Sequence, residues 1–112
     1  MKLIRTQDTK FSIIIEPTPG DDIADSTIAR LVSQDGKPIP ADEPLFIIRG
    51  RDILAIQTLR DYRAHAIGIG ADAEHIVAVE GRIREFDRFK NTYPECMKKP
   101  DTDIMKLNKP VI

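Results

Sequence analysis

The spacing of the apolar residues changes near residue 52, and this change constrains the fold more than any other feature of the chain. Before it, apolar residues come in short β-branched runs, such as residues 11–15. After it, they recur every three or four residues as far as residue 93. Short β-branched runs are typical of strands, and the longer period is typical of amphipathic helices. The sequence therefore predicts an α+β fold in which a small sheet precedes a pair of helices.

Three strands are expected in the first part of the chain. Residues 11–15 form the clearest one, residues 27–32 form a second that ends at the turn dipeptide Asp35-Gly36, and the apolar run 45–48 forms a third. No helix-length segment separates these runs, so there is no room for the crossover that parallel neighbours need. We therefore expect a small, mostly antiparallel N-terminal sheet.

Two helices are expected after residue 52. The first begins with Asp52 as its N-cap and ends at Gly68 and Gly70, and the second begins with Asp72 and ends before Pro94. The apolar residues of the first are Ile53, Ile56, Leu59, Tyr62 and Ala66. The stripe of the second, which we expect to be buried, is Ile76, Val79, Ile83 and Phe86, with Phe89 and Tyr93 beside it. Because the glycine link is short, the helices must lie antiparallel, with their stripes facing each other or covering the sheet.

The length of 112 residues predicts a single domain. It divides into a β region (1–51), a helical hairpin (52–93) and an extended C-terminal tail (94–112). The end of this tail is too apolar for an ordinary solvated end. We expect it to pack across a neighbouring subunit and to make the protein a homo-oligomer.

The charge and the cysteine content limit which partners and which cellular compartment are expected. The chain carries 17 basic and 18 acidic residues, a net charge of -1, which argues against nonspecific coating of nucleic acid. Binding that depends on charge must therefore be local. Cys96 is the single cysteine and cannot form an intramolecular disulfide, so a reducing cytoplasm is expected. No stretch has the apolar length of a leader or a membrane span.

Arginine supplies the clearest binding signal. Seven of the nine arginines lie between residues 49 and 88, and the planar guanidinium suits phosphate and carboxylate groups. Arg49 and Arg51 stand where the third expected strand meets the start of a helix, whose free N–H groups and dipole attract anions. Arg84 and Arg88 are four residues apart and share one helix face. An aromatic ring beside them could stack on a base. The candidate ligand-binding residues are Arg49, Arg51, Arg84, Arg88, Phe86 and Phe89.

Each of these signals has a structural alternative. Glu80 precedes Arg84 by four residues and Glu85 precedes Arg88 by three, which are the spacings of ordinary surface ion pairs. Asp52 could itself occupy the N-terminal donors of the first helix and leave the neighbouring arginines solvated. The phenylalanines could belong to the core.

No residue pattern indicates catalysis or a cofactor. The three serines lie outside any nucleophile elbow, and nothing pairs Cys96 with a histidine in a catalytic motif. His65 and His75 lie on opposite helices without a further ligand at metal spacing. We therefore expect a protein that is not an enzyme and that has no metal site and no cofactor.

Three motifs, in this order, carry a family resemblance. They are DEPLFIIRGRD at residues 42–52, RIREFDRF at 82–89 and PECMKKPD at 94–101. Together they resemble a widespread family of small phage and bacterial proteins over about residues 27–102, whereas the first 26 residues do not match. A short β region followed by a helix pair is also similar in layout to the phage anti-Thoeris sponge proteins, which sequester cyclic ADP-ribose-type signals and form multimers.

The resemblance implies a phage-type protein without enzymatic activity. Such a protein would bind an anionic, nucleotide-derived signal, of cyclic nucleotide or ADP-ribose type, in the host cytoplasm and so counter host defence. Two alternatives stay open at this point. One is an interaction module that inhibits a host protein through an apolar helix face and the acidic Asp21-Asp22 loop. The other is an accessory protein of nucleic-acid metabolism.

Overall fold

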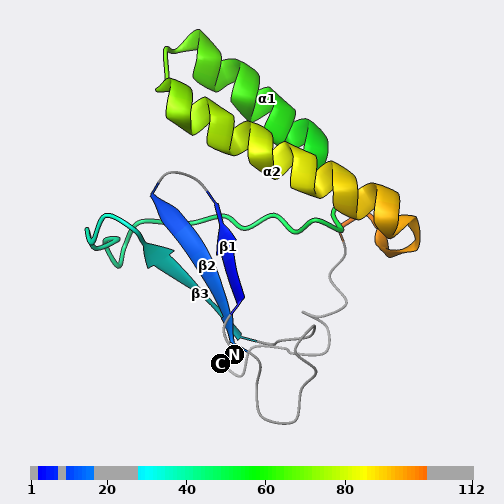
Figure 1. The fold of residues 1–112 in the computed structure, drawn as a ribbon, viewed down its shortest axis with the longest axis horizontal. Helices are drawn as coiled ribbons and strands as arrows, with labels where there is room; N and C mark the ends of the chain where they lie inside the picture. The colour runs from blue at the N-terminus through cyan, green and yellow to red at the C-terminus, as the bar shows by residue number, and fades with distance from the viewer. Residues whose placement is uncertain (1–2, 8–9, 17–27, 101–112) are drawn as a thin grey trace.

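The chain folds into three strands followed by two helices and a short 3-10 turn (Figure 1). The computed structural model describes residues 3–7, 10–16 and 28–100. The elements in chain order are β1 (Leu3–Thr6), β2 (Phe11–Glu16), β3 (Ile28–Ser33), α1 (Ala55–Gly68), α2 (Ala73–Thr92) and the 3-10 turn η1 (Pro94–Cys96). The predicted α+β class is confirmed. The apolar chain end and the Asp21-Asp22 loop lie outside the described residues.

The sheet has the order β1-β2-β3, and both pairs of neighbours are antiparallel. In its register, Ile14 pairs with Ile4 on one side and with Arg30 on the other. The predicted strands at residues 11–15 and 27–32 are thus present, as is their antiparallel arrangement.

The predicted third strand at residues 45–48 is wrong. This segment has no regular structure, and the Phe46 and Ile47 residues are 89% and 77% exposed. Its place in the sheet is taken by β1, which the sequence analysis missed. β1 and β2 are close neighbours in sequence and need to close only a short loop, so their pairing costs less chain entropy than that of a distant segment.

The turn after β3 forms where Asp35-Gly36 predicted it. Ser33 Oγ donates a hydrogen bond to Asp35 Oδ1 (2.6 Å), and the Lys37 N–H donates to the same oxygen (3.0 Å). Both bonds lower the pKa of the Asp35 carboxyl below its ordinary value, and the bond from Ser33 has the larger effect. Gly36 adopts a φ of 74°, in the left-handed region that glycine enters without strain.

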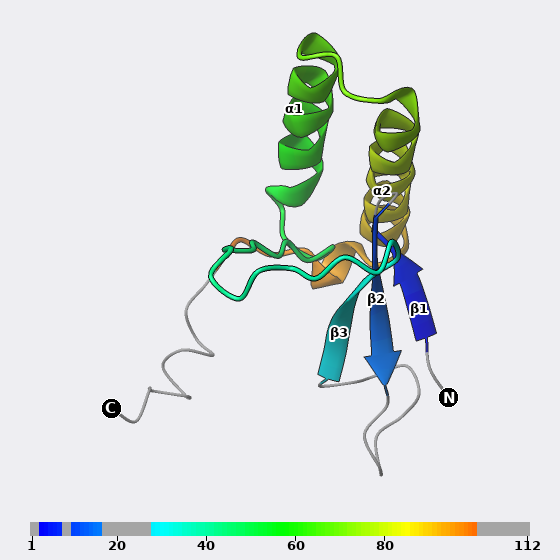
Figure 2. The same cartoon turned by 90° about the vertical axis from the view of Figure 1, so that its left-hand side faces the viewer.

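Helices α1 and α2 lie side by side and antiparallel, on one side of the sheet (Figures 1 and 2). Their link has the hydrogen bonds of a Schellman motif: the Gly70 N–H donates to Ile67 O (3.1 Å) and the Ala71 N–H to Ala66 O (2.9 Å). Gly70 has a φ of 77°. The predicted glycine connection is therefore confirmed, and its geometry depends on Gly70.

Gly70 and Gly68 offer a matched test of this connection. A Cβ at either position would meet no atom within 4 Å, so an effect of alanine must come from the backbone. Gly70→Ala is expected to lower the free energy of unfolding by about 1–2 kcal/mol because alanine is strained at positive φ. Gly68→Ala, inside the helix, is expected to raise it by about 0.4–1 kcal/mol. Urea denaturation checks both signs, and equal shifts in one direction would contradict the assignment.

The described core lies between the two helices and is small. Its buried apolar residues are Ala55, Ile56, Ala66 and Val79. Of the predicted stripe of α2 only Val79 is buried, and its other members are half-buried. The reason is that no described strand contacts either helix, so the two stripes face each other and no described strand covers their margins. In α1, Tyr62 is about half exposed, and Ile53 is exposed ahead of the helix.

The start of α1 differs from the prediction. The helix begins at Ala55 with Leu54 at the cap position, and Asp52 lies ahead of it. The Asp52 Oδ1 accepts a hydrogen bond from the Leu54 N–H (2.8 Å), and Asp52 O accepts one from the Ala55 N–H (3.0 Å). Asp52 thus closes a turn that leads into the helix. Asp72 does occupy the N-cap position of α2, without a side-chain cap bond.

An irregular segment, residues 34–54, connects β3 to α1. In both views it passes between the sheet and the helical hairpin (Figures 1 and 2). Within the described ranges, neither helix is long and apolar enough to cross a bilayer.

Candidate ligand-binding groove

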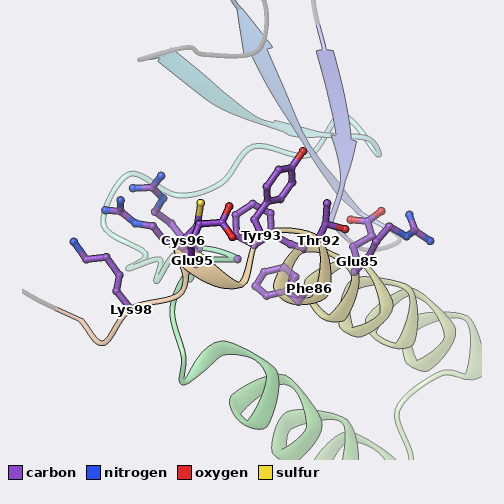
Figure 3. Close-up of a pocket in the computed structure, with 12 residues that line it drawn as sticks. Glu85, Phe86, Thr92, Tyr93, Glu95, Cys96 and Lys98 are labelled. Atoms are coloured by element: carbon purple, nitrogen blue, oxygen red, sulfur yellow. The ribbon is translucent and has the colours of Figure 1, made fainter.

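A groove of about 1010 Å³ lies where the C-terminal half of α2 meets the segment ahead of α1. Figure 3 shows Glu85 and Phe86 on the helix, with Glu95 and Lys98 on the opposite side. The lining comes from residues 49–51, from the end of α2 and from the residues that directly follow α2, so segments more than thirty residues apart in sequence form one surface. Its lining residues are Arg49, Gly50, Arg51, Glu85, Phe86, Arg88, Phe89, Thr92, Tyr93, Glu95, Cys96 and Lys98.

Main-chain hydrogen bonds hold two of these stretches together. The Lys98 N–H donates to Arg51 O (3.0 Å), and the Ile53 N–H donates to Lys98 O (3.1 Å), around a parallel bridge between Asp52 and Lys98. We call this pair of bonds the clasp. Because the chain reverses through η1 directly after α2, the clasp fixes residues 49–51 beside the end of that helix.

The aromatic residues form the apolar part of the groove. The rings of Phe89 and Tyr93 are tilted by 46° with their centroids 5.3 Å apart. Phe86 lies almost one turn earlier on the same side of α2, and all three rings line the groove. A Cβ at Gly50 would lie 3.5 Å from Cδ1 of Phe89, so the backbone of residues 49–51 passes directly over this ring. The Tyr93 and Phe89 rings are therefore held in place while part of their surface faces the groove.

The charged lining is positive. Arg49, Arg51, Arg88 and Lys98 contribute four positive charges, and Glu85 and Glu95 contribute two negative ones, which leaves two positive charges. A salt bridge from Arg82 (3.3 Å) already neutralises Glu85. Among the described residues, no ion pair or hydrogen bond engages the guanidinium of Arg49, Arg51 or Arg88. An anion can therefore bind these three groups without breaking an ion pair or hydrogen bond of the described residues.

The groove is not built on the helix end that the sequence suggested. No residue of α1 lines it, and Arg49 and Arg51 lie beside the C-terminal end of α2. That end carries the negative pole of the helix dipole. The positive side chains must offset this pole before they attract an anion, and they outnumber the two carboxylates that share the groove.

Five of the six predicted ligand residues meet in the groove, and Arg84 does not. Arg84 lies in a separate hollow of about 380 Å³, together with Arg60, Arg63, Glu80 and Ile83. A separation of four residues places Arg84 and Arg88 on one helix face but also about 6 Å apart along the axis. The two side chains therefore line different depressions.

The ion pairs that the spacing suggested are also replaced. Glu80 binds Arg63 across the helix pair (3.2 Å), and Glu85 binds Arg82 within α2 (3.3 Å). Neither Arg84 nor Arg88 takes part in an ion pair within the part of the chain that the structure describes. The structural alternative for these two arginines, a surface salt bridge with Glu80 or Glu85, is therefore wrong.

Sequence reasoning missed seven of the twelve residues that line the groove. The residues it did not select are Gly50, Glu85, Thr92, Tyr93, Glu95, Cys96 and Lys98. Helical spacing could have found some of them, because Glu85 and Thr92 are seven residues apart and share a face with Phe89. The other lining residues after Tyr93 follow from the chain reversal at η1, which the sequence analysis interpreted as part of an extended tail.

The histidines lie elsewhere. His75 Nε2 shares a hydrogen bond with the Tyr62 hydroxyl (2.8 Å), and the two rings meet edge to face. Among the described residues, no cluster of three or more histidine, cysteine, aspartate or glutamate side chains could hold a metal ion. Cys96 is an exposed free thiol at the groove.

Comparison of the chain with protein-family models, with curated proteins and with solved structures finds no match. The family resemblance drawn from the three sequence motifs therefore stays a prediction.

Proposed function

We propose that the groove binds an anionic, nucleotide-derived small molecule and retains it without chemical change. The observation that carries this proposal is the meeting, in one depression, of a pair of aromatic rings and three guanidinium groups that have no ion pair or hydrogen bond within the described part of the chain. Arginine forks match phosphate oxygens, and the rings offer a surface on which a base can stack. The proposed ligand is of the cyclic nucleotide or ADP-ribose type.

The magnitudes are sufficient for net binding. A hydrogen bond to a charged group contributes about 1.5–3 kcal/mol, and base stacking on a ring contributes about 1–3 kcal/mol. Three such bonds and one stack exceed the cost of immobilising a small ligand at the lower end of its range, about 4 kcal/mol. The groove volume of about 1010 Å³ matches the upper end of ligand pockets, about 1,000 Å³.

Retention without turnover fits a sponge that lowers the concentration of a free signal. We place this role in a phage-type protein acting in the host cytoplasm, in line with the motif resemblance. No group of the groove is arranged as a nucleophile with an adjacent base, which favours binding over catalysis.

Arg88 and Arg84 provide a matched pair for the test. Both are exposed arginines on α2 without an ion pair among the described residues, but only Arg88 lines the groove. Arg88→Glu is expected to weaken the binding of an adenine nucleotide by about tenfold to a hundredfold, as the loss of one charge-assisted bond requires. Arg84→Glu is expected to leave the affinity within about twofold, because Arg84 does not line the groove and its exposed charge is partly screened by salt. Calorimetric titration with cyclic and linear adenine nucleotides, ADP-ribose included, measures both.

Two results would sink the proposal: no binding of any of these nucleotides by the unchanged protein, or equal weakening by the two substitutions. A complementary experiment denatures the washed protein after incubation with a nucleotide extract and identifies the released molecule by mass spectrometry.

Exposed apolar residues at the tip of the hairpin favour a second candidate, a module that binds and inhibits a host protein. Ile67 and Val77 are about half and two-thirds exposed beside the link, and the Ile69 residue between them is 86% exposed. Large apolar side chains of this kind are typical anchors of protein interfaces. If the groove binds no nucleotide while Ile69→Asp abolishes the capture of a host polypeptide, this second function takes the place of the first.

A further inference from the structure

The segment Leu45–Ile48, which we call the strap, has the composition of a strand but no strand partner. Its first three residues are 60%, 89% and 77% exposed. No main-chain hydrogen bond is recorded for its four residues among the described part of the chain. Three consecutive β-prone side chains are thus exposed, the Ile48 residue after them is half-buried, and the backbone of all four has no main-chain partner among the described residues. Globular proteins avoid such an arrangement unless a partner covers it.

The same molecule contains a sheet with an open edge. Among the described residues, the order β1-β2-β3 leaves β1 and β3 each with a strand neighbour on one side only. β3 comprises six residues, Ile28–Ser33, and is long enough to pair with the whole strap. Leu31, in its middle, is 39% exposed. An unpaired edge of this kind is a template for another strand.

We propose that the strap of one copy adds as a fourth strand to the β3 edge of a second copy, and that the two copies exchange straps reciprocally. Edge addition supplies hydrogen bonds for the strap backbone and covers its side chains, as in other cases of β-augmentation. A twofold arrangement satisfies both copies with one type of contact. This inference does not rest on the proposed ligand.

The strap is tied to the groove at its C-terminal end, which restricts its pairing with the edge of its own sheet. Its C-terminal end continues into Arg49 and Gly50, which lie over Phe89, and then into the clasp at Lys98. These contacts anchor the C-terminal end of the strap beside the end of α2. A second copy is not subject to this restraint.

The area is adequate for a stable dimer. The exposed surface of Leu45, Phe46 and Ile47 amounts to roughly 400 Å², judged from the size of buried apolar and aromatic side chains. With the receiving surfaces counted, two exchanged straps bury roughly 1,600 Å², the standard size of a specific interface. A single strap on an unrelated partner would bury about half of this, below the usual threshold of about 1,000 Å². The area therefore favours a second copy of this chain as the partner of the strap.

Sedimentation velocity over a wide range of protein concentration tests the proposal with variants matched in exposure. Phe46→Ser and Ile69→Ser each remove an apolar side chain from a residue that is almost fully exposed, at 89% and 86%. We expect the unchanged protein and Ile69→Ser to be dimeric, and Phe46→Ser to raise the dimer dissociation constant at least about tenfold. Ile47→Pro, which removes a strand donor, is expected to do the same. Far-UV circular dichroism shows whether each variant retains its helices.

A monomeric unchanged protein at high micromolar concentration would overturn the proposal, and so would a Phe46→Ser dimer as tight as the original. A cross-link decides which surfaces meet. In a Cys96→Ser background, chains with Leu31→Cys are mixed with chains of different mass that carry Phe46→Cys, and a short bis-maleimide is added. Exchange predicts a covalent pair of unlike chains. A third sample carries Leu31→Cys and Phe46→Cys in the same chain. If the mixture gave no covalent pair and this third sample formed the link within one chain, the strap would lie on its own sheet instead.

Discussion

Replacing Ile56 by alanine is expected to lower the free energy of unfolding by about 2–4 kcal/mol. Ile56 lies in the first turn of α1 and is 9% exposed. Two of the four buried apolar residues in the described core are alanines, so Ile56 and Val79 are its two larger side chains. Because a domain of this size has about 5–15 kcal/mol of stability in total, the loss is a large fraction of it.

Urea denaturation followed by far-UV circular dichroism measures this change, and Ile69→Ala is the control. It makes the same truncation at a residue that is 86% exposed, where a surface substitution costs within about 0.5 kcal/mol. If Ile56→Ala shifted the midpoint no more than Ile69→Ala, the helix pair would not have its core where the structure places it.

Reversing both charges of the segment beside α2, in the variant Arg49→Glu with Arg51→Glu, is expected to weaken ADP-ribose binding by about a hundredfold to ten-thousandfold. Each arginine contributes a charge-assisted bond of about 1.5–3 kcal/mol on the proposed function, and 1.4 kcal/mol corresponds to a factor of ten. The two substitutions leave one arginine in a groove that then holds four carboxylates. The affinity should also fall with added salt in the unchanged protein, since the attraction is partly screened.

The matched variant Arg49→Lys with Arg51→Lys separates charge from shape. It keeps both positive charges but loses the planar forks, so a smaller loss of affinity is expected than for the glutamates. Neither pair of substitutions should change the melting temperature appreciably, because the side chains make no described ion pair. A loss of binding accompanied by unfolding would mean that these arginines stabilise the fold, and a glutamate variant that binds normally would remove them from the site.

The helical hairpin was predictable because its signals are local. The three- and four-residue period, Asp72 at a cap and Gly70 at positive φ all lie within the segment that they organise. The depth of burial was not predictable in the same way. The stripe from Ile76 to Phe86 gives a direction toward a partner, but the number of partners depends on the whole fold. Among the described strands and helices, α1 packs along α2 and no strand does.

The strands were less predictable than the helices, because their pairing depends on contacts between separate segments. Leu45–Ile48 and Phe11–Glu16 look alike in sequence, as apolar runs rich in isoleucine, but only the second pairs. Strand pairing is decided by which segments meet, and β propensity mainly reports a fit to a half-buried surface. β1 was missed for the same reason: the four residues Leu3–Thr6 carry little signal until β2 is placed beside them.

The groove was foreseen in its residues but not in its construction. Arginines near aromatics on α2 and at residues 49–51 indicated an anion site, and they do lie together. The expected mechanism relied on the N-terminal end of α1. What brings the residues together is a contact between positions 51–53 and 98, which are more than forty residues apart, and no local pattern announces such a pairing.

Because the clasp is made of main-chain bonds, the width of the groove and the side chains that line it can vary independently. Its two hydrogen bonds join main-chain atoms of Arg51, Ile53 and Lys98, so the spacing of the walls does not depend on which side chains these positions carry. Substitution of Arg51 or Lys98 by other residues that keep their N–H can alter the preferred ligand while the walls stay where they are. Proline is the exception, because at position 53 or 98 it removes a donor. A scaffold of this kind can acquire new specificities one side chain at a time without having to evolve a new shape.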